Sequence, residues 1–134
     1  MIICMVCETV FREELNIFRG SSCPKIECQG QLIHLDENMY EVYKLLNSKG
    51  FVTRNCCTAH SYDERPKLYI QFEDAYIFPT LPCSFKTEVH DVGRGKWATI
   101  SKEFNYQSTV DLQMQIWQTC ADLLQWAEQL KKNE

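Results

Sequence analysis

The fold of this chain is decided by residues 38–60, NMYEVYKLLNSKGFVTRNCCTAH. Asn38 is a favourable helix N-cap, and Glu41, three residues later, completes a capping box. Apolar residues then recur at three- and four-residue spacing, which predicts a helix with one buried face. Gly50 stands where helices commonly end in the left-handed conformation, and Phe51 can fold back onto the last turn. The stretch therefore predicts a helix that a glycine ends, followed directly by a strand.

Two pairs of cysteines precede this stretch, one with CxxC and one with CxxxxC spacing. Each spacing makes a tight knuckle, and two knuckles supply the four tetrahedral ligands of a structural zinc ion. A segment this short cannot bury a core, so the metal would supply its folding energy. Four cysteines also close the shell, which favours a structural ion over a catalytic one. We expect a zinc-ribbon module at residues 1–30, with Zn bound by Cys4, Cys7, Cys23 and Cys28.

Residues 31–134 predict a single α+β body. Alternating or strongly apolar segments indicate five strands, at residues 31–36, 51–56, 67–73, 84–90 and 97–104. A final helix is expected from about Thr109 to Lys131, with Ser108 and Asp111 as its capping pair. The predicted fold class is α+β, with an N-terminal zinc ribbon followed by a roughly five-stranded sheet and two helices packed on one face.

Composition restricts the function. The chain has 134 residues, 45% of them hydrophobic, eight cysteines and a formal net charge of −4. No apolar run approaches the roughly 20 residues of a membrane span, and the first residues lack the features of a signal peptide. We therefore expect a cytoplasmic protein whose cysteines are metal ligands or buried thiols. The acidic charge disfavours generic nucleic-acid binding, which depends on phosphate contacts.

A loop with two thiols and an imidazole is the first candidate for chemistry. It begins at Cys56-Cys57 and continues through His60 and Tyr62. His60 could activate Cys57 as a nucleophile, or these side chains could bind a second metal ion. Such a metal site would need a further ligand from Cys83, His34 or His90. The third reading is that the residues line a pocket or only pack. No third catalytic residue can be identified, so we do not assign an enzyme.

The second candidate is the basic, glycine-rich segment Gly93-Arg94-Gly95-Lys96-Trp97. Glycines beside basic residues and an aromatic ring could hold a phosphate and stack a base. The segment lacks the spacing of a P-loop, and a solvated hairpin turn is the simpler interpretation. The predicted ligand-binding residues for an anionic or nucleotide-like ligand are Cys57, His60, Tyr62, Arg94, Lys96 and Trp97.

The final helix carries two tryptophans, Trp117 and Trp126, close to one apolar stripe. Most of this stripe is expected to pack in the core. If Trp126 lies off the main face, it could anchor a homodimer or another partner.

The order of the motifs resembles a known group of proteins. The chain resembles small zinc-ribbon proteins of Gram-positive bacteria and their phages. The resemblance lies in the order of CxxC, CPxxxC, a helix and then K-G-F-x-T-x-x-C-C-x-x-H. In that family the central motif usually reads Cys-Cys-Ser-Gly-His, whereas this chain has Thr58-Ala59 in the middle. A fainter likeness is to the tRNA wybutosine-synthesis methyltransferase family, whose comparable loop reads Ser-Ser-Cys-Ser-Gly-Arg. Of that run, this chain matches only the cysteine, with Cys57. We carry no activity over from that family.

Together these features favour a zinc-containing protein that binds a small anionic or nucleotide-like ligand near the loop at Cys57. In a phage setting, the resemblance implies sequestration of a host signalling nucleotide or inhibition of a host protein. One alternative is an enzyme that uses Cys57 and His60 or a second metal. The other is a protein–protein adaptor that acts through the ribbon and the C-terminal helix.

Overall fold

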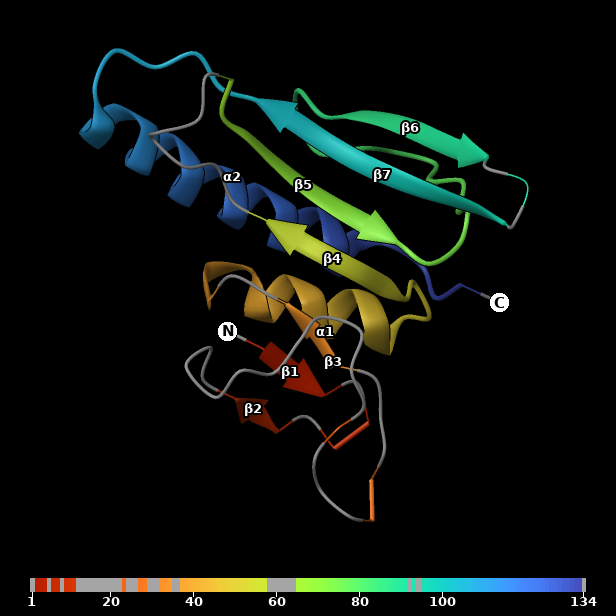
Figure 1. Cartoon of the computed structure of the whole chain (residues 1–134). Coiled ribbons are helices and arrows are strands. Elements are labelled where there is room, and N and C mark those ends of the chain that lie inside the picture. Colours follow the sequence, from red (N-terminus) through yellow and green to blue (C-terminus); the bar gives the residue numbers. More distant parts are fainter. Residues whose placement is uncertain are drawn as a thin grey trace.

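The computed structural model describes most of the chain as two antiparallel sheets and two α-helices (Figure 1). The residues described are 2–4, 6–7, 9–11, 23, 27–28, 32–34, 37–57, 65–91, 93 and 95–133. The elements, in chain order, are β1 (Ile2–Cys4), β2 (Val10–Phe11), β3 (Leu32–His34), a 3-10 turn (Glu37–Met39), α1 (Tyr40–Ser48), β4 (Thr53–Cys57), β5 (Lys67–Phe72), β6 (Lys86–Asp91), β7 (Lys96–Glu103) and α2 (Thr109–Gln129).

The main sheet has four antiparallel strands, in the order β4-β5-β7-β6. The α+β class is confirmed, but the prediction of about five strands is wrong. The strand expected at residues 31–36 forms β3, which pairs with β1 in a separate sheet of order β2-β1-β3. β3 and β4 therefore flank α1 without sharing a sheet. Strand pairing is non-local, and the sequence pattern of β3 did not specify its partner.

One face of the main sheet forms the core together with both helices. Along β5, Leu68, Ile70 and Phe72 are fully buried, and Ile70 lies opposite Ile100 of β7. Residues from α1 and α2 pack in the same hydrophobic cluster, including Val42, Leu46, Leu112, Ile116 and Leu123. Both helices thus cover the same face of the sheet, here called the inner face. The opposite, outer face carries Tyr69, Gln71, Trp97, Thr99, Ser101, Glu88 and His90 by alternation.

The end of α1 has the predicted geometry. Gly50 has a φ of 88°, and its N–H donates to the Asn47 carbonyl at 3.0 Å. The Phe51 N–H donates to the Leu46 carbonyl at 3.0 Å, which completes a Schellman motif. A side chain at position 50 would be strained by the positive φ and would also approach the Asn133 carbonyl oxygen to 3.1 Å.

The predicted start of α1 is wrong. The helix is preceded by the 3-10 turn, and its N-cap residue is Met39, which makes no capping hydrogen bond through its side chain. Met39 is fully buried, and its sulfur lies 3.7 Å from the Cys120 sulfur of α2. Burial of this side chain in the core sets how the chain enters the helix, and it displaces the cap expected at Asn38.

The start of α2 has the predicted cap, but the idea that Trp126 lies on the surface does not hold. The Ser108 hydroxyl accepts a hydrogen bond from the Asp111 N–H at 3.0 Å, as a cap should. Trp126 is buried, and its indole N–H donates to the Thr80 carbonyl at 3.0 Å. The idea of Trp126 as a surface anchor is therefore wrong, and Trp117 is the exposed tryptophan. Neither described helix combines the length and apolar character that a membrane span requires.

Lys49 joins the ends of the two helices. Its Nζ donates to the carbonyls of Ala127, Glu128 and Leu130 at 2.7, 2.7 and 2.6 Å. These oxygens belong to the last turn of α2, where the helix leaves carbonyls without internal partners and the dipole favours a cation. The Lys49 carbonyl in turn accepts from the Asn133 N–H at 2.7 Å. The C-terminal segment is thereby held against the end of α1.

We expect Lys49→Met to lower the free energy of unfolding by about 1–3 kcal/mol, because three helix-end carbonyls lose a charged donor. The measurement is urea denaturation followed by circular dichroism. Lys131→Met is the matched control, since Lys131 is exposed just beyond α2, and it should change stability by less than about 0.5 kcal/mol. Equal effects of the two substitutions would contradict the role given to Lys49.

Candidate metal centre

The four cysteines predicted as metal ligands meet at one point. The Cys4 and Cys28 sulfurs are 3.5 Å apart, and those of Cys7 and Cys23 are 3.8 Å apart. All four sulfurs lie within 4.8 Å of one another. Sulfurs placed about 2.3 Å from one tetrahedral zinc ion are separated by about 3.8 Å. The cluster can therefore hold a metal ion, and its donor set is entirely thiolate.

The first knuckle is positioned by the small sheet. Cys4 ends β1, where it lies opposite Leu32 of β3. Its N–H donates to the Thr9 carbonyl at 3.1 Å, and the Val6 N–H points to its sulfur at 3.4 Å. These bonds close the turn that brings Cys7 back toward Cys4. Local hydrogen bonds thus position the first pair of cysteines, Cys4 and Cys7.

Burial differs among the four thiols. Cys4 and Cys23 are buried, Cys28 is partly exposed and Cys7 is exposed. The Cys7 sulfur lies 3.1 Å from the Thr9 hydroxyl oxygen. Hydrogen bonds from the Thr9 hydroxyl and backbone N–H stabilise the thiolate and lower the pKa of Cys7 to about 6. A lowered pKa favours the thiolate, which is the form of cysteine that binds a metal ion.

The structure describes only the first two residues of the CCTAH motif, Cys56 and Cys57. Cys56 is buried in the core, opposite Ile70. Cys57 ends β4 opposite Tyr69, while His60 and Tyr62 lie outside the described residues. Among the described residues, the group Cys4, Cys7, Cys23 and Cys28 is the one set that could hold a metal ion. Burial of Cys56 in the core leaves it a packing role.

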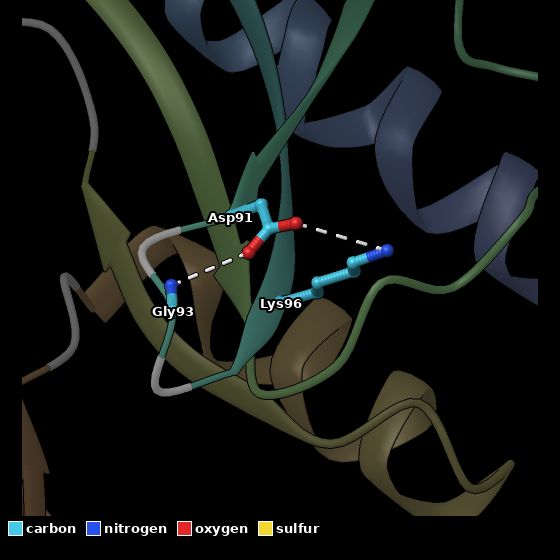
Figure 2. Close-up of polar contacts among 3 residues, drawn as sticks. All are labelled: Asp91, Gly93 and Lys96. Carbon is cyan, nitrogen blue, oxygen red and sulfur yellow. Dashed lines mark hydrogen bonds and ion pairs between the residues drawn. The ribbon is translucent and has the colours of Figure 1, made fainter.

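The basic turn between β6 and β7 is partly neutralised by Asp91. Figure 2 shows its carboxylate accepting from the Gly93 N–H at 3.3 Å and lying 3.8 Å from the Lys96 Nζ. The two side chains of this ion pair are 63% and 58% exposed, so the pair adds little stability. It nevertheless places a carboxylate where the sequence suggested a site for an anion. Arg94 lies outside the described residues.

Of the predicted ligand-binding residues, the structure describes Cys57, Lys96 and Trp97, and it does not bring these three together. Lys96 and Trp97 are successive strand residues, which point to opposite faces. Register places Cys57 opposite Tyr69, which in turn lies opposite Ser101. Trp97 is four residues further along β7, or about 13 Å. The end of β4 at Cys57 and the start of β7 at Lys96 therefore lie at opposite ends of the main sheet (Figure 1).

Sequence reasoning singled out Trp97 but missed the cluster that this residue forms on the outer face. The Trp97 ring stacks on His90 of β6, with centroids 5.3 Å apart and an interplanar angle of 23°. The exposed Arg54 reaches it from β4, with its Cζ 5.4 Å from the ring centroid. The Trp97 Nε1 and the Thr99 Oγ1 are buried, and neither has a hydrogen-bond partner among the described residues. We call Arg54, His90, Trp97 and Thr99 the outer-face cluster.

The register explains why this cluster was hard to find. Arg54 sits at an irregularity in the pairing of β4 with β5, between Thr53 and Asn55. Its guanidinium then crosses β5 to reach β7, two strands away. A bulge redirects a side chain in a way that strict alternation does not predict. The alternation of β7 alone could have placed Trp97 and Thr99 on one face.

Comparison with protein-family models, with curated proteins and with solved structures gives no match for this chain. The fold and the site define an α+β protein with a cluster of four cysteines that could hold a metal ion, beside a small three-stranded sheet. The family resemblances drawn from the sequence stay predictions.

We expect Cys23→Ser to lower the metal content from one ion per chain to a small fraction, because a hydroxyl is a poor substitute for a thiolate ligand. Native mass spectrometry with elemental analysis measures this. Cys83→Ser is the matched control, since Cys83 is exposed and outside the cluster. Full metal content in Cys23→Ser would exclude the four-cysteine site.

Proposed function

We propose that the ion is zinc and that its role is structural. Four thiolates in tetrahedral spacing suit zinc, which binds soft thiolate ligands and has no redox chemistry. A closed shell of four protein ligands keeps no position for substrate. The small sheet has strands of two or three residues, so the ion would supply much of its stability. Elemental analysis that returned iron instead of zinc would overturn this assignment.

We further propose that the outer-face cluster binds a small anionic, nucleotide-like ligand. The observation that supports this is a pair of buried polar atoms, the Trp97 Nε1 and the Thr99 Oγ1, which have no hydrogen-bond partner within the described part of the chain. A buried donor without an acceptor costs about 1–3 kcal/mol, so proteins rarely keep one without a use. An indole N–H can only donate, and so can a guanidinium. The cluster therefore presents donors that an oxygen-rich anion would satisfy.

The surroundings of the cluster favour a small ligand over a long polyanion. The chain carries a formal net charge of −4, which opposes generic binding to nucleic acid. Glu88 lies opposite Thr99 in the register, so a carboxylate borders the cluster. A ligand that combines an anionic group with hydroxyl or amino groups suits both neighbours, and nucleotides have this combination. Bidentate contact from Arg54 would set the orientation of the anionic group.

The biological setting is part of the same proposal. None of the seven described cysteines forms a disulfide, which suits a reducing cytoplasm. The resemblance to phage proteins supports a role in sequestering a host signalling nucleotide or inhibiting a host protein. Catalysis by Cys57 and His60 stays a prediction from the sequence, because His60 lies outside the described residues.

If the proposed site is correct, Thr99→Val should raise the stability of the free protein and lower its affinity for the ligand. The free protein should become more stable by up to about 1 kcal/mol, because a buried hydroxyl without a partner is replaced by a methyl group. Ligand binding should weaken about tenfold, because one donor to the ligand is lost. Thermal unfolding with and without a panel of nucleotides and cyclic nucleotides measures both effects, since a bound ligand raises the melting temperature by mass action.

Arg54→Ala should abolish the ligand-induced rise in melting temperature, because it removes the one exposed cation of the outer-face cluster. Arg65→Ala is the matched control, as Arg65 is exposed at the opposite end of the main sheet, just before β5. Loss of the response in Arg65→Ala with full response in Arg54→Ala would move the site to the end of the main sheet where β4 ends at Cys57. If no nucleotide shifts the melting temperature of the unaltered chain, the ligand class is wrong.

A further inference from the structure

The helix α2 has a second apolar stripe that faces away from the core. Val110, Met114 and Trp117 are 70%, 63% and 62% exposed, although all three are large apolar residues. Ala121, also exposed, continues the same line. The core side of α2 is formed by other residues, Leu112, Ile116, Thr119, Leu123, Trp126 and Ala127. The stripe is thus additional to the face that packs in the fold. We call these four residues the α2 seam.

The spacing of the seam is that of a helix–helix interface. Its members are separated by four, three and four residues, which is the alternation of d and a positions in a heptad repeat. Residues at this spacing form a narrow line along a helix, and a facing helix with the same spacing can interlock with it. A scatter of single exposed apolar residues would need no explanation, but a contiguous line marks an interaction surface.

Charge around the seam indicates what covers it. The exposed positions of α2 up to Ala121 carry no charged side chain, and Gln113 and Gln118 flank the seam. A membrane surface or a nucleic acid would require cations here, and a basic protein would require carboxylates. The chain as a whole carries a net charge of −4. An uncharged strip on an acidic protein is the surface at which a second copy meets no electrostatic repulsion.

We propose that two copies of this chain form an antiparallel dimer through their α2 seams. In this register Met114 packs against the partner's Trp117, and Val110 packs against the partner's Ala121. The two largest pairs lie at the centre, the two smaller ones lie at the ends, and a two-fold axis relates them. Asp111 faces the partner's Gln118, so no like charges meet. Antiparallel helices also place opposite dipole ends together.

The seam is short compared with a standard interface, which buries about 800 Å² per partner. We therefore expect a reversible dimer whose population depends on concentration. This dimer is independent of the ligand proposed for the outer-face cluster, since α2 packs on the inner face of the sheet.

Sedimentation velocity of the metal-containing full chain, over a dilution series with a phosphine reductant, tests the dimer. The unaltered chain should shift from monomer to dimer as concentration rises, and Trp117→Glu should weaken the association at least about tenfold. Ile77→Glu is the matched control, because Ile77 is an apolar residue with 93% exposure outside α2, and it should associate like the unaltered chain. A chain that stays monomeric at the highest concentration, or a Trp117→Glu variant that dimerises normally, would overturn the proposal.

The register is tested by mixing two variants. Met114→Glu and Trp117→Lys should each dimerise poorly alone. In an antiparallel pair, the introduced carboxylate of one chain faces the introduced ammonium of the other, and the remaining pair is the original Met114 with Trp117. An equimolar mixture should therefore associate more strongly than either variant. Failure of the mixture to do so would contradict the antiparallel register.

Discussion

The alternation of side chains across β5 and β7 is the constraint on which the rest of the structure depends. These central strands place Leu68, Ile70 and Ile100 toward the helices, and the opposite set of residues toward the outer face. Slipping the register by one residue would bury the polar set and expose the apolar set. The same alternation separates Lys96 from Trp97 and places Cys56 in the core. It therefore decides which side chains are available for binding.

The four-cysteine cluster rests on a different constraint. Its sulfurs converge through short knuckles and through the pairing of β1 with β3. A three-stranded sheet of such short strands has little buried apolar surface to offset the entropy of ordering. The two parts of the chain therefore differ in what can stabilise them: one has a four-cysteine cluster that could hold a metal ion, and the other has a buried hydrophobic core. The Lys49 bridge belongs to the second part, where it joins the ends of both helices.

Two features of this molecule lower the stability of the isolated chain and are explained more easily if they bind something. One is the pair of buried donors in the outer-face cluster. The other is the line of exposed apolar residues along α2. Each costs free energy in the isolated chain, through an unmade hydrogen bond or through apolar area left in water. They lie on opposite sides of the sheet, so a ligand at the first and a second chain at the second would not compete.

The sequence by itself determined what depends on neighbours along the chain. Cysteine spacing predicted the four-cysteine cluster, Gly50 and Phe51 predicted the end of α1, and Ser108 predicted the start of α2, because each acts within a few residues. The tertiary structure alone decided that β3 pairs with β1, that Trp126 is buried while Trp117 is exposed, and that Arg54 reaches Trp97. Pairing, burial and long-range contacts depend on which distant segments pack together, and a local pattern carries no information about that choice.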